Sequence, residues 1–236
     1  MSKDSFNFKK FTIKQDKCAM KVGTDGVLLG AWANIPSNGK IADIGTGTGL
    51  LAIMAAQRSI TSTITGIEID EAASHQAYDN MKNSPWSDRL SVVTADVNDF
   101  YHKNISEFDC ILSNPPYFSE KIKSNKENRN IARHTDSLSF IQLALSASYM
   151  LKEGGNFCII LPSESAFDFI SETLKTDLRL KKRTDIITKT GGTPKRVMME
   201  FVKGNNRIIA EYGQIVLNCN GEKSEEYRNL TDEFYL

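Results

Sequence analysis

Lys40-Ile41-Ala42-Asp43-Ile44-Gly45-Thr46-Gly47-Thr48-Gly49 is the stretch that decides the fold of this 236-residue chain. Its first five residues form a short apolar run that predicts a buried strand, and residues 50–58 follow as a helix. The three glycines between them let the backbone turn tightly and let a ligand approach the N–H groups at the start of the helix. A strand, a glycine loop and a helix in this order indicate the first unit of an α/β fold.

The same alternation of strand and helix continues to residue 203. Strands and helices alternating in this way predict an α/β fold with a doubly wound, mostly parallel seven-stranded sheet, whose ligands bind outside the carboxyl ends of the strands. Beyond the first unit, we expect strands near residues 64–68, 91–94, 108–113, 156–161, 180–188 and 196–203, and helices near 70–83, 138–151 and 163–175.

Two extensions flank this core of residues 40–203. Residues 34–39 are rich in turn formers and mark the boundary of an N-terminal extension, residues 1–39. Within it, Phe6 to Ile13 alternate apolar and polar side chains like a strand. Residues 204–236 form a C-terminal extension that we expect to pack on the core.

Composition narrows the class of protein. The 29 basic and 29 acidic residues cancel, and the chain is 40% hydrophobic, enough to bury a full core. The four cysteines are far apart and form no Cys-x-x-Cys pair, which argues against a zinc knuckle or a disulfide framework. No signal peptide or membrane span is visible, so we expect a soluble, cytoplasmic protein without a bound metal.

Acidic residues at the strand ends indicate the kind of ligand. Glu68 ends the second strand of the core, where an acid accepts from ribose hydroxyls, and Asp96 follows the third, placed to accept from an adenine amino group. Asp43 precedes the glycine loop, where its charge suits a cationic amino-acid group better than a pyrophosphate. A glycine loop followed by two spaced acids therefore indicates a nucleoside with a positive tail, and S-adenosylmethionine is such a molecule.

A second motif follows the fourth strand of the core. Asn114-Pro115-Pro116-Tyr117 ends the strand, because neither proline can donate to the sheet. The carboxamide of Asn114 is then held out at the carboxyl end of the strand, beside backbone carbonyls and the aromatic pair Tyr117-Phe118. This arrangement suits a flat ring that carries an amino group.

Charge is unevenly distributed despite the zero balance. Residues 1–23, 121–133 and 175–196 are basic, whereas residues 40–120 are acidic. If the basic segments meet around one cleft, they form a surface for phosphates; each could equally be a solvated face or loop.

A resemblance to the class I S-adenosylmethionine-dependent methyltransferases is carried by the glycine loop, Glu68, Asp96 and Asn114-Pro115-Pro116-Tyr117 in this order. The Asn-Pro-Pro-Tyr form is typical of members that methylate an exocyclic or amide nitrogen. Residues 21–32, 194–197 and 230–236 are similar to the bacterial valine-tRNA adenine-N6 methyltransferases. The resemblance implies a tRNA substrate, methylated at the adenosine immediately 3′ of the anticodon of a valine tRNA, and a monomer or weak homodimer.

Each site residue receives an expected role from the motifs and this resemblance. In the family, the segment around Thr24 caps the cofactor, so residues 1–39 are expected to cap the site. The expected catalytic residues are Asn114, Pro115 and Tyr117; the expected cofactor-binding residues are Lys21, Thr24, Asp25, Asp43, Gly45, Gly47, Gly49, Glu68, Asp96 and Val97; and the expected substrate-binding residues are Pro116, Phe118, Arg133, Lys195 and Arg196.

Alternatives share parts of this pattern. Release-factor glutamine methyltransferases also carry Asn-Pro-Pro-Tyr, but they usually have a separate N-terminal helical domain, and here only 39 residues precede the core. Transfer to guanine N2 or cytosine N4, including bases of rRNA, is compatible with the same scaffold. A non-catalytic nucleoside-binding module would not need an intact catalytic motif beside an intact cofactor site.

Overall fold

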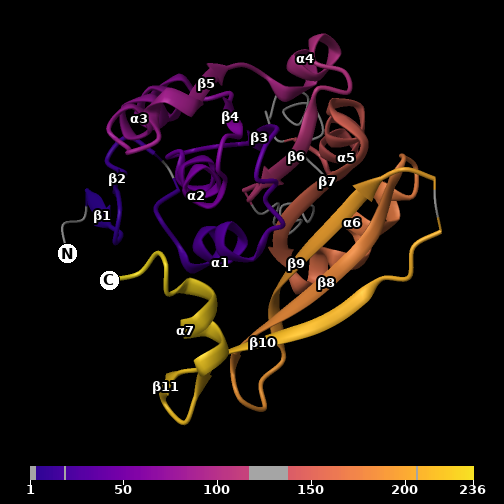
Figure 1. Ribbon diagram of the computed structural model, residues 1–236. Coiled ribbons are helices and arrows are strands. Elements are labelled where there is room, and N and C mark those ends of the chain that lie inside the picture. The colour runs from indigo at the N-terminus through magenta and orange to yellow at the C-terminus, as the bar shows by residue number, and fades with distance from the viewer. Residues whose placement is uncertain (1–3, 19, 117–137, 206) are drawn as a thin grey trace, which may run out of the picture.

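A single large β-sheet forms the centre of the computed structural model, which describes residues 4–18, 20–116, 138–205 and 207–236 (Figure 1). Within those residues the sheet has nine strands. In spatial order they are β11 (Glu222–Lys223), β10 (Glu211–Cys219), β8 (Leu178–Lys189), β9 (Pro194–Lys203), β7 (Leu151–Pro162), β6 (Phe108–Ser113), β3 (Lys40–Ile44), β4 (Thr63–Glu68) and β5 (Leu90–Thr94).

The sheet is mostly parallel, as expected. Strands β7, β6, β3, β4 and β5 run parallel to one another, whereas β9 is antiparallel to both β7 and β8. The α/β fold class is therefore confirmed, and the seven expected strands are β3 to β9. The predicted total of seven was wrong, because β10 pairs in parallel with β8 and β11 pairs with β10. Gly213 and Gln214 interrupt the apolar alternation of β10, so its sequence gives a weak strand signal.

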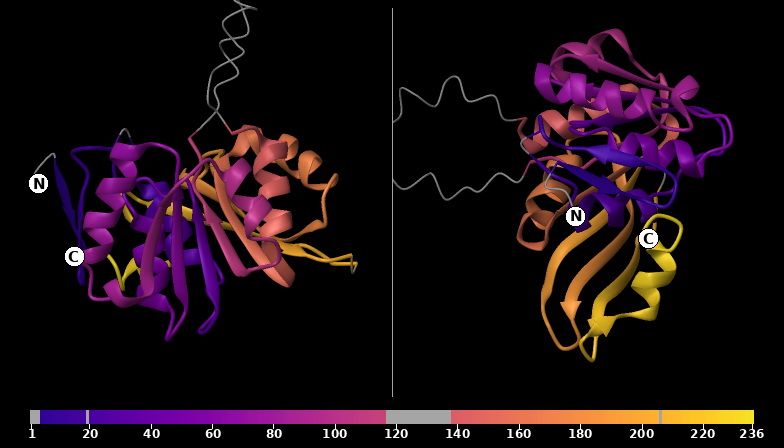
Figure 2. Two further views of the ribbon diagram at one scale, coloured as in Figure 1. Left: turned by 90° about the horizontal axis from the view of Figure 1, so that it is seen from above. Right: turned by 90° about the vertical axis from the view of Figure 1, so that its left-hand side faces the viewer.

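Helices cover both faces of the sheet (Figure 2). Ile41 and Leu112 point to one face and Ala42 and Ile111 to the other, which follows from the two-residue period of a strand. The first face packs on α1 (Thr24–Trp32), α2 (Leu50–Arg58), α3 (Glu71–Lys82) and α7 (Glu225–Thr231); the second packs on α4 (Val97–Phe100), α5 (Phe140–Met150) and α6 (Ala166–Thr173). Short 3₁₀ turns are η1 (Ser87–Arg89), η2 (Tyr101–Lys103) and η4 (Ser163–Ser165).

The N-terminal extension begins as a hairpin rather than one strand. It pairs β1 (Ser5–Asn7) with β2 (Thr12–Lys14), and the turn between them closes with a bond from the Phe8 N–H to the Phe11 carbonyl (2.8 Å). The hairpin lies beside the C-terminal segment, where the Lys9 N–H donates to the Phe234 carbonyl (2.9 Å) and the Phe8 ring stacks on Tyr235. The two extensions therefore support each other.

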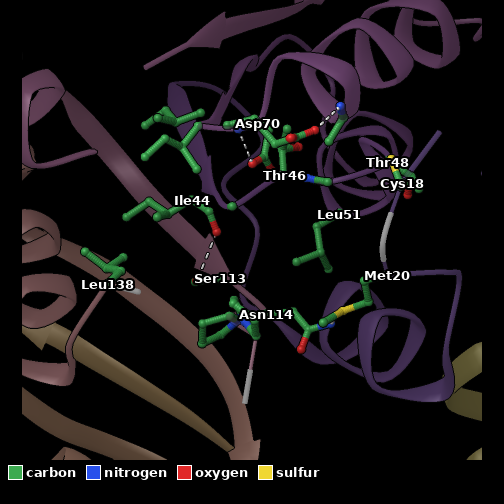
Figure 3. Close-up of a pocket in the computed structure, with 18 of the residues that line it drawn as sticks. Cys18, Met20, Ile44, Thr46, Thr48, Leu51, Asp70, Ser113, Asn114 and Leu138 are labelled. Atoms are coloured by element: carbon green, nitrogen blue, oxygen red, sulfur yellow. Dashed lines mark hydrogen bonds between the residues drawn. The ribbon is translucent and has the colours of Figure 1, made fainter. Parts of the chain in front are cut away.

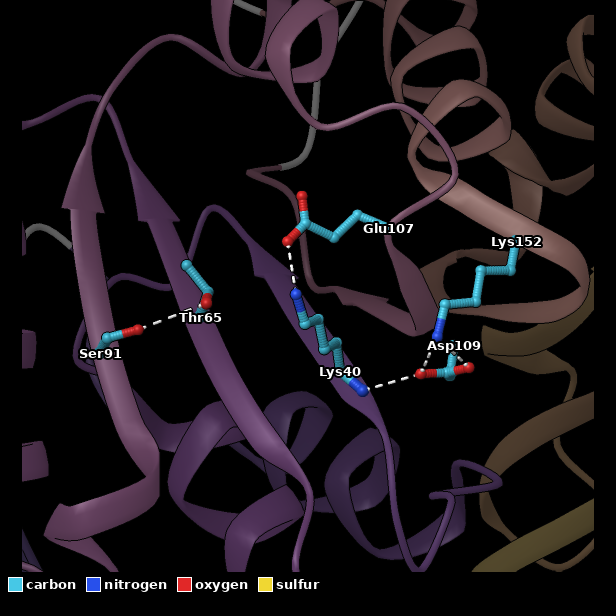
Figure 4. Close-up of polar contacts among 6 residues, drawn as sticks. All are labelled: Lys40, Thr65, Ser91, Glu107, Asp109 and Lys152. Atoms are coloured by element: carbon cyan, nitrogen blue, oxygen red, sulfur yellow. Dashed lines mark hydrogen bonds and ion pairs between the residues drawn. The ribbon is translucent and has the colours of Figure 1, made fainter.

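A network of charged side chains ties together the strand ends opposite the glycine loop (Figure 4). Asp109 accepts from the Lys40 N–H (2.8 Å), and both of its oxygens lie 2.8 Å from Lys152 Nζ. Lys40 Nζ lies 2.7 Å from Glu107 Oε1. Burial raises the pKa of Asp109, but the bonds from Lys152 and Lys40 outweigh it, so the pKa lies below its ordinary value.

The helices are short compared with a bilayer. Among the described helices the longest, α3, has 12 residues, whereas spanning a membrane takes about 20 apolar residues. No helix in these parts of the chain meets both the length and the apolarity that a membrane span requires.

Candidate functional site: a cavity beside the glycine loop

The glycine loop has the backbone geometry that its sequence predicts. Gly45, Gly47 and Gly49 have φ angles of 70°, 55° and 81°, in the left-handed region that favours glycine. A side chain at Gly45 would meet nothing within 4 Å, and at Gly47 only the Gly45 carbonyl, so this part of the loop is open to a ligand. A Cβ added at Gly49 would instead lie 3.5 Å from Ala77 on α3, so this end of the loop faces that helix rather than the cavity.

Asp43 supports the loop from beneath. Its side chain is fully buried, and Oδ2 accepts a hydrogen bond from Thr46 Oγ1 (2.6 Å). Oδ1 has no hydrogen-bond partner in the part of the chain that the structure describes. Burial raises the pKa of Asp43 to about 7, against the lowering effect of the Thr46 bond. Asp43 is not among the residues that line the cavity described below, so its bond to Thr46 supports the loop from outside the cavity.

The acids at the next two strand ends are fixed by backbone N–H groups. Glu68 accepts from the Gly47 N–H (2.9 Å) and, through its other oxygen, from the Asp70 N–H (3.0 Å). Asp96 caps α4, since its Oδ1 accepts from the N–H and the side-chain amide of Asn98 (2.8 and 2.9 Å). A carboxylate oxygen has more than one lone pair, so both acids can still accept from ligand hydroxyl or amino groups.

These elements surround one cavity of about 500 Å³ (Figure 3). That volume lies in the usual range for small-molecule sites, about 300–1,000 Å³. The walls combine polar groups of the loop and strand ends with apolar side chains, among them Ile44, Leu51, Ile67, Val97 and Leu138. Of the expected cofactor-binding residues, Lys21, Gly45, Gly47, Glu68, Asp96 and Val97 line it, whereas Thr24, Asp25, Asp43 and Gly49 do not.

Asn114 faces the same cavity from the end of β6. The preceding residue, Ser113, anchors the strand end to β3 by donating from Oγ to the Ile44 carbonyl (2.9 Å). Asn114 Oδ1 is buried and has no hydrogen-bond partner among the described residues. Its Nδ2 lies 4.0 Å from the sulfur of Met20, a weak contact. A buried carboxamide oxygen without a partner is uncommon and points to a ligand group that donates to it.

The other residues expected to take part in catalysis or substrate binding fall into three groups. Pro115 and Pro116 line the cavity beside Asn114, the first buried and the second exposed. Lys195 is exposed at the start of β9, and Arg196 pairs with Asp25. Tyr117, Phe118 and Arg133 lie outside the described residues, so their expected roles stay predictions.

Sequence reasoning placed the N-terminal extension over the site but did not name most of the residues with which it lines the cavity. Cys18, Met20, Val22 and Gly23 line it from the segment between β2 and α1. Val22 and Gly23 belong to the stretch 21–32 that carries the family resemblance, whereas no motif marks Cys18 or Met20.

Comparison with known proteins identifies the class. The fold is similar to a predicted O-methyltransferase, Atu636, from Agrobacterium tumefaciens (TM-score 0.72, 20% identity, 89% of this chain and 96% of that one). It is also similar to TYW2 of Pyrococcus horikoshii, solved with MeSAdo (TM-score 0.62, 15% identity, 87% and 74%). Residues 21–179 match the family model described as "Methyltransferase small domain", and the chain belongs to this methyltransferase family.

Relatives of similar length narrow the family further. The chain is 44% identical to a protein of Bacteroides thetaiotaomicron over 100% of this chain and 99% of that one, and 46% identical to one of Phocaeicola vulgatus over 98% and 97%. A protein of Citrobacter koseri is 38% identical over 100% and 96%. All three are named tRNA1(Val) (adenine(37)-N6)-methyltransferase. The family resemblance expected from the sequence is therefore confirmed.

Proposed function

We propose that this protein transfers a methyl group from S-adenosylmethionine to N6 of adenosine 37 in tRNA1(Val). The names of its full-length relatives support this substrate. The observation that carries the chemistry is the buried, unpartnered Oδ1 of Asn114 in the wall of the cavity. An amino group that donates to this oxygen satisfies it, whereas a substrate group without a hydrogen-bond donor does not.

The cavity fits the cofactor. The open face of Gly45 and Gly47 leaves room for a ligand against the loop, and Glu68 and Asp96 offer acceptors for ribose hydroxyls and an adenine amino group. Lys21 also lines the cavity, and an ammonium group there can pair with the carboxylate of the cofactor. When bound, S-adenosylmethionine supplies an electrophilic methyl group on a sulfonium centre.

Asn114 acts on the target nitrogen. The lone pair of an adenine amino group is delocalised into the ring, so the nitrogen is a poor nucleophile. Hydrogen bonds from its two hydrogens to Asn114 Oδ1 and the Pro115 carbonyl fix the nitrogen and stabilise the positive charge that grows on it. No base is needed before attack, because the nitrogen becomes acidic only after methylation. Tyr117, by the family motif, stacks on the base and sets its plane.

We infer the RNA contacts from the basic side chains that lie near the carboxyl ends of the parallel strands. Lys195 is exposed at the start of β9, on the strand that also carries Arg196, and Lys21 lines the cavity. We infer that Lys195 contacts tRNA phosphates while the target base, splayed from the anticodon loop, enters beside Asn114. A cytoplasmic location and a monomer or weak homodimer belong to the same proposal.

Methyl transfer from labelled cofactor to total tRNA, followed by nucleoside analysis, tests the function. We expect labelled N6-methyladenosine, confined to one tRNA species. Lys195→Ala should raise the KM for tRNA and lower the salt slope of tRNA affinity by about one, as expected for one lost phosphate contact. Labelled glutamine in protein with no labelled tRNA would overturn the assignment, and labelled N2-methylguanosine would change the target base.

A further inference from the structure

The segment that joins β2 to α1 forms one wall of the cavity, and its first residue, Lys14, is the last residue of β2. We call residues 14–23 the N-terminal strap; all but residue 19 are described. It leaves β2, crosses the cavity with Cys18, Met20, Lys21, Val22 and Gly23 at its lining, and enters α1. Because most of the strap lies outside the helices and strands, its backbone groups need partners elsewhere.

Two buried amides on α3 supply some of those partners. Gln76 and Asn80 are 2% and 3% exposed, and a spacing of four residues places them on one face of the helix. The Lys17 N–H donates to Gln76 Oε1 (2.7 Å), and the Lys14 N–H donates to Asn80 Oδ1 (2.9 Å). Buried amides that accept from a separate segment hold that segment in one position.

Asn80 also bonds the glycine loop. Its Nδ2 donates to the Lys14 carbonyl and to the Thr48 carbonyl, both at 2.8 Å. Thr48 belongs to the glycine loop and lines the cavity. One carboxamide thus bonds the strap and the loop at once, whereas Gln76 bonds the strap at Lys17. Neither Asn80 nor Gln76 is among the residues that line the cavity.

We propose that Asn80 is a positioning residue that fixes the strap against the glycine loop and thereby sets the affinity for the cofactor. This inference rests on the proposed function in so far as the ligand is S-adenosylmethionine. With the bonds of Asn80 in place, the two walls are held at their bound spacing before the ligand arrives, so binding loses less conformational freedom. Asn114 follows β6 and makes none of these bonds, and its contact with the strap is the weak one to Met20 (4.0 Å), so we expect the methyl-transfer step to depend little on Asn80.

Calorimetry with the demethylated product, S-adenosylhomocysteine, tests the proposal without turnover. Asn80→Ala removes three hydrogen bonds and should weaken binding about tenfold or more. Hydrogen exchange of residues 14–23 in the cofactor-free variant should accelerate. With saturating cofactor, kcat and the KM for tRNA should stay near the wild-type values, while the KM for S-adenosylmethionine rises.

Matched variants separate positioning from a general loss of stability. Asn83→Ala, at the end of the same helix, removes only a bond to the Asp79 carbonyl (2.7 Å) and should leave cofactor affinity unchanged. Gln76→Leu loosens the strap alone and should weaken binding less than Asn80→Ala. Gln76→Glu, which keeps an acceptor for Lys17, should restore part of that loss. If Asn80→Ala does not fold, this Gln76 pair carries the test through the strap.

Two results would overturn the proposal. The first is wild-type affinity for S-adenosylhomocysteine in folded Asn80→Ala, or unchanged affinity in Gln76→Leu if the former does not fold. The second is weakened binding with unchanged exchange of residues 14–23. A wild-type protein that binds S-adenosylhomocysteine but methylates no tRNA would contradict the proposed substrate and leave this inference testable by the same titration.

Discussion

Arg196 Nε lies 2.8 Å from Asp25 Oδ2, so the first residues of β9 are joined to the first turn of α1. The two side chains were expected to serve different ligands, Asp25 the cofactor and Arg196 the RNA. Both side chains are about a quarter to a third exposed. Asp25 lies in the first turn of α1, where the helix dipole stabilises a negative charge. The pair joins α1 to β9 at the edge of the sheet where the strap enters α1.

The coupling between these residues should be modest. A double-mutant cycle with Asp25→Ala and Arg196→Ala, followed by urea unfolding, should give about 0.5–1 kcal/mol, because the pair is partly exposed. The value should fall at high salt. A coupling indistinguishable from zero at low salt would show that the contact does not hold α1 in place.

Asn114→Ala should separate catalysis from stability. Removing one preorganised polar group from a reacting centre lowers the rate by about 10²–10³-fold. Cofactor affinity should stay near normal, and the melting temperature should stay equal or rise, because an unpartnered buried oxygen is removed. Single-turnover kinetics measures the rate, titration calorimetry measures the cofactor affinity, and thermal unfolding measures the melting temperature. A variant with normal turnover would remove Asn114 from the mechanism.

Asp43 should make the stability of the cofactor-free protein depend on pH. Its pKa rises from 3.8 to about 7 on folding, so the folded state holds this proton more tightly than the unfolded chain. Its contribution to stability is therefore fully present below about pH 4 and is lost as the pH rises through about 7. Asp43→Asn keeps an acceptor for Thr46 and should remove this decline in urea titrations. An identical decline in the variant would assign it to another group.

Asp109 should give stability the opposite pH dependence. Its pKa is lowered in the folded state, so its contribution is present above the ordinary value of 3.8 and is lost as the pH falls through the folded value. Because the side chain is 30% exposed, we expect less than about 1 kcal/mol. Unfolding of Asp109→Asn at acidic and neutral pH measures the difference. Equal pH dependence in wild type and variant would contradict it.

The sequence predicted which residues face the cavity better than it predicted which residues hold the cavity walls in place. Glu68 and Asn114 follow strands whose carboxyl ends share one edge, and strand order alone brings such residues together. Asp43 and Gly49 belong to the same motif, but the motif does not reveal that one lies beneath the loop and the other faces α3. Asn80 resembles any polar helix residue in the sequence, because its partners are backbone groups 32 and 66 positions away.

The packing of Phe8 on Tyr235 has a consequence for synthesis of the chain. A ribosome makes the hairpin first, yet the hairpin reaches its final partners only after residues 232–235 have been made. Until then, the segment leading into the strap lacks its bond to Phe234 and its aromatic neighbour. The nascent protein can therefore complete the central sheet before one wall of its cofactor cavity is fully anchored.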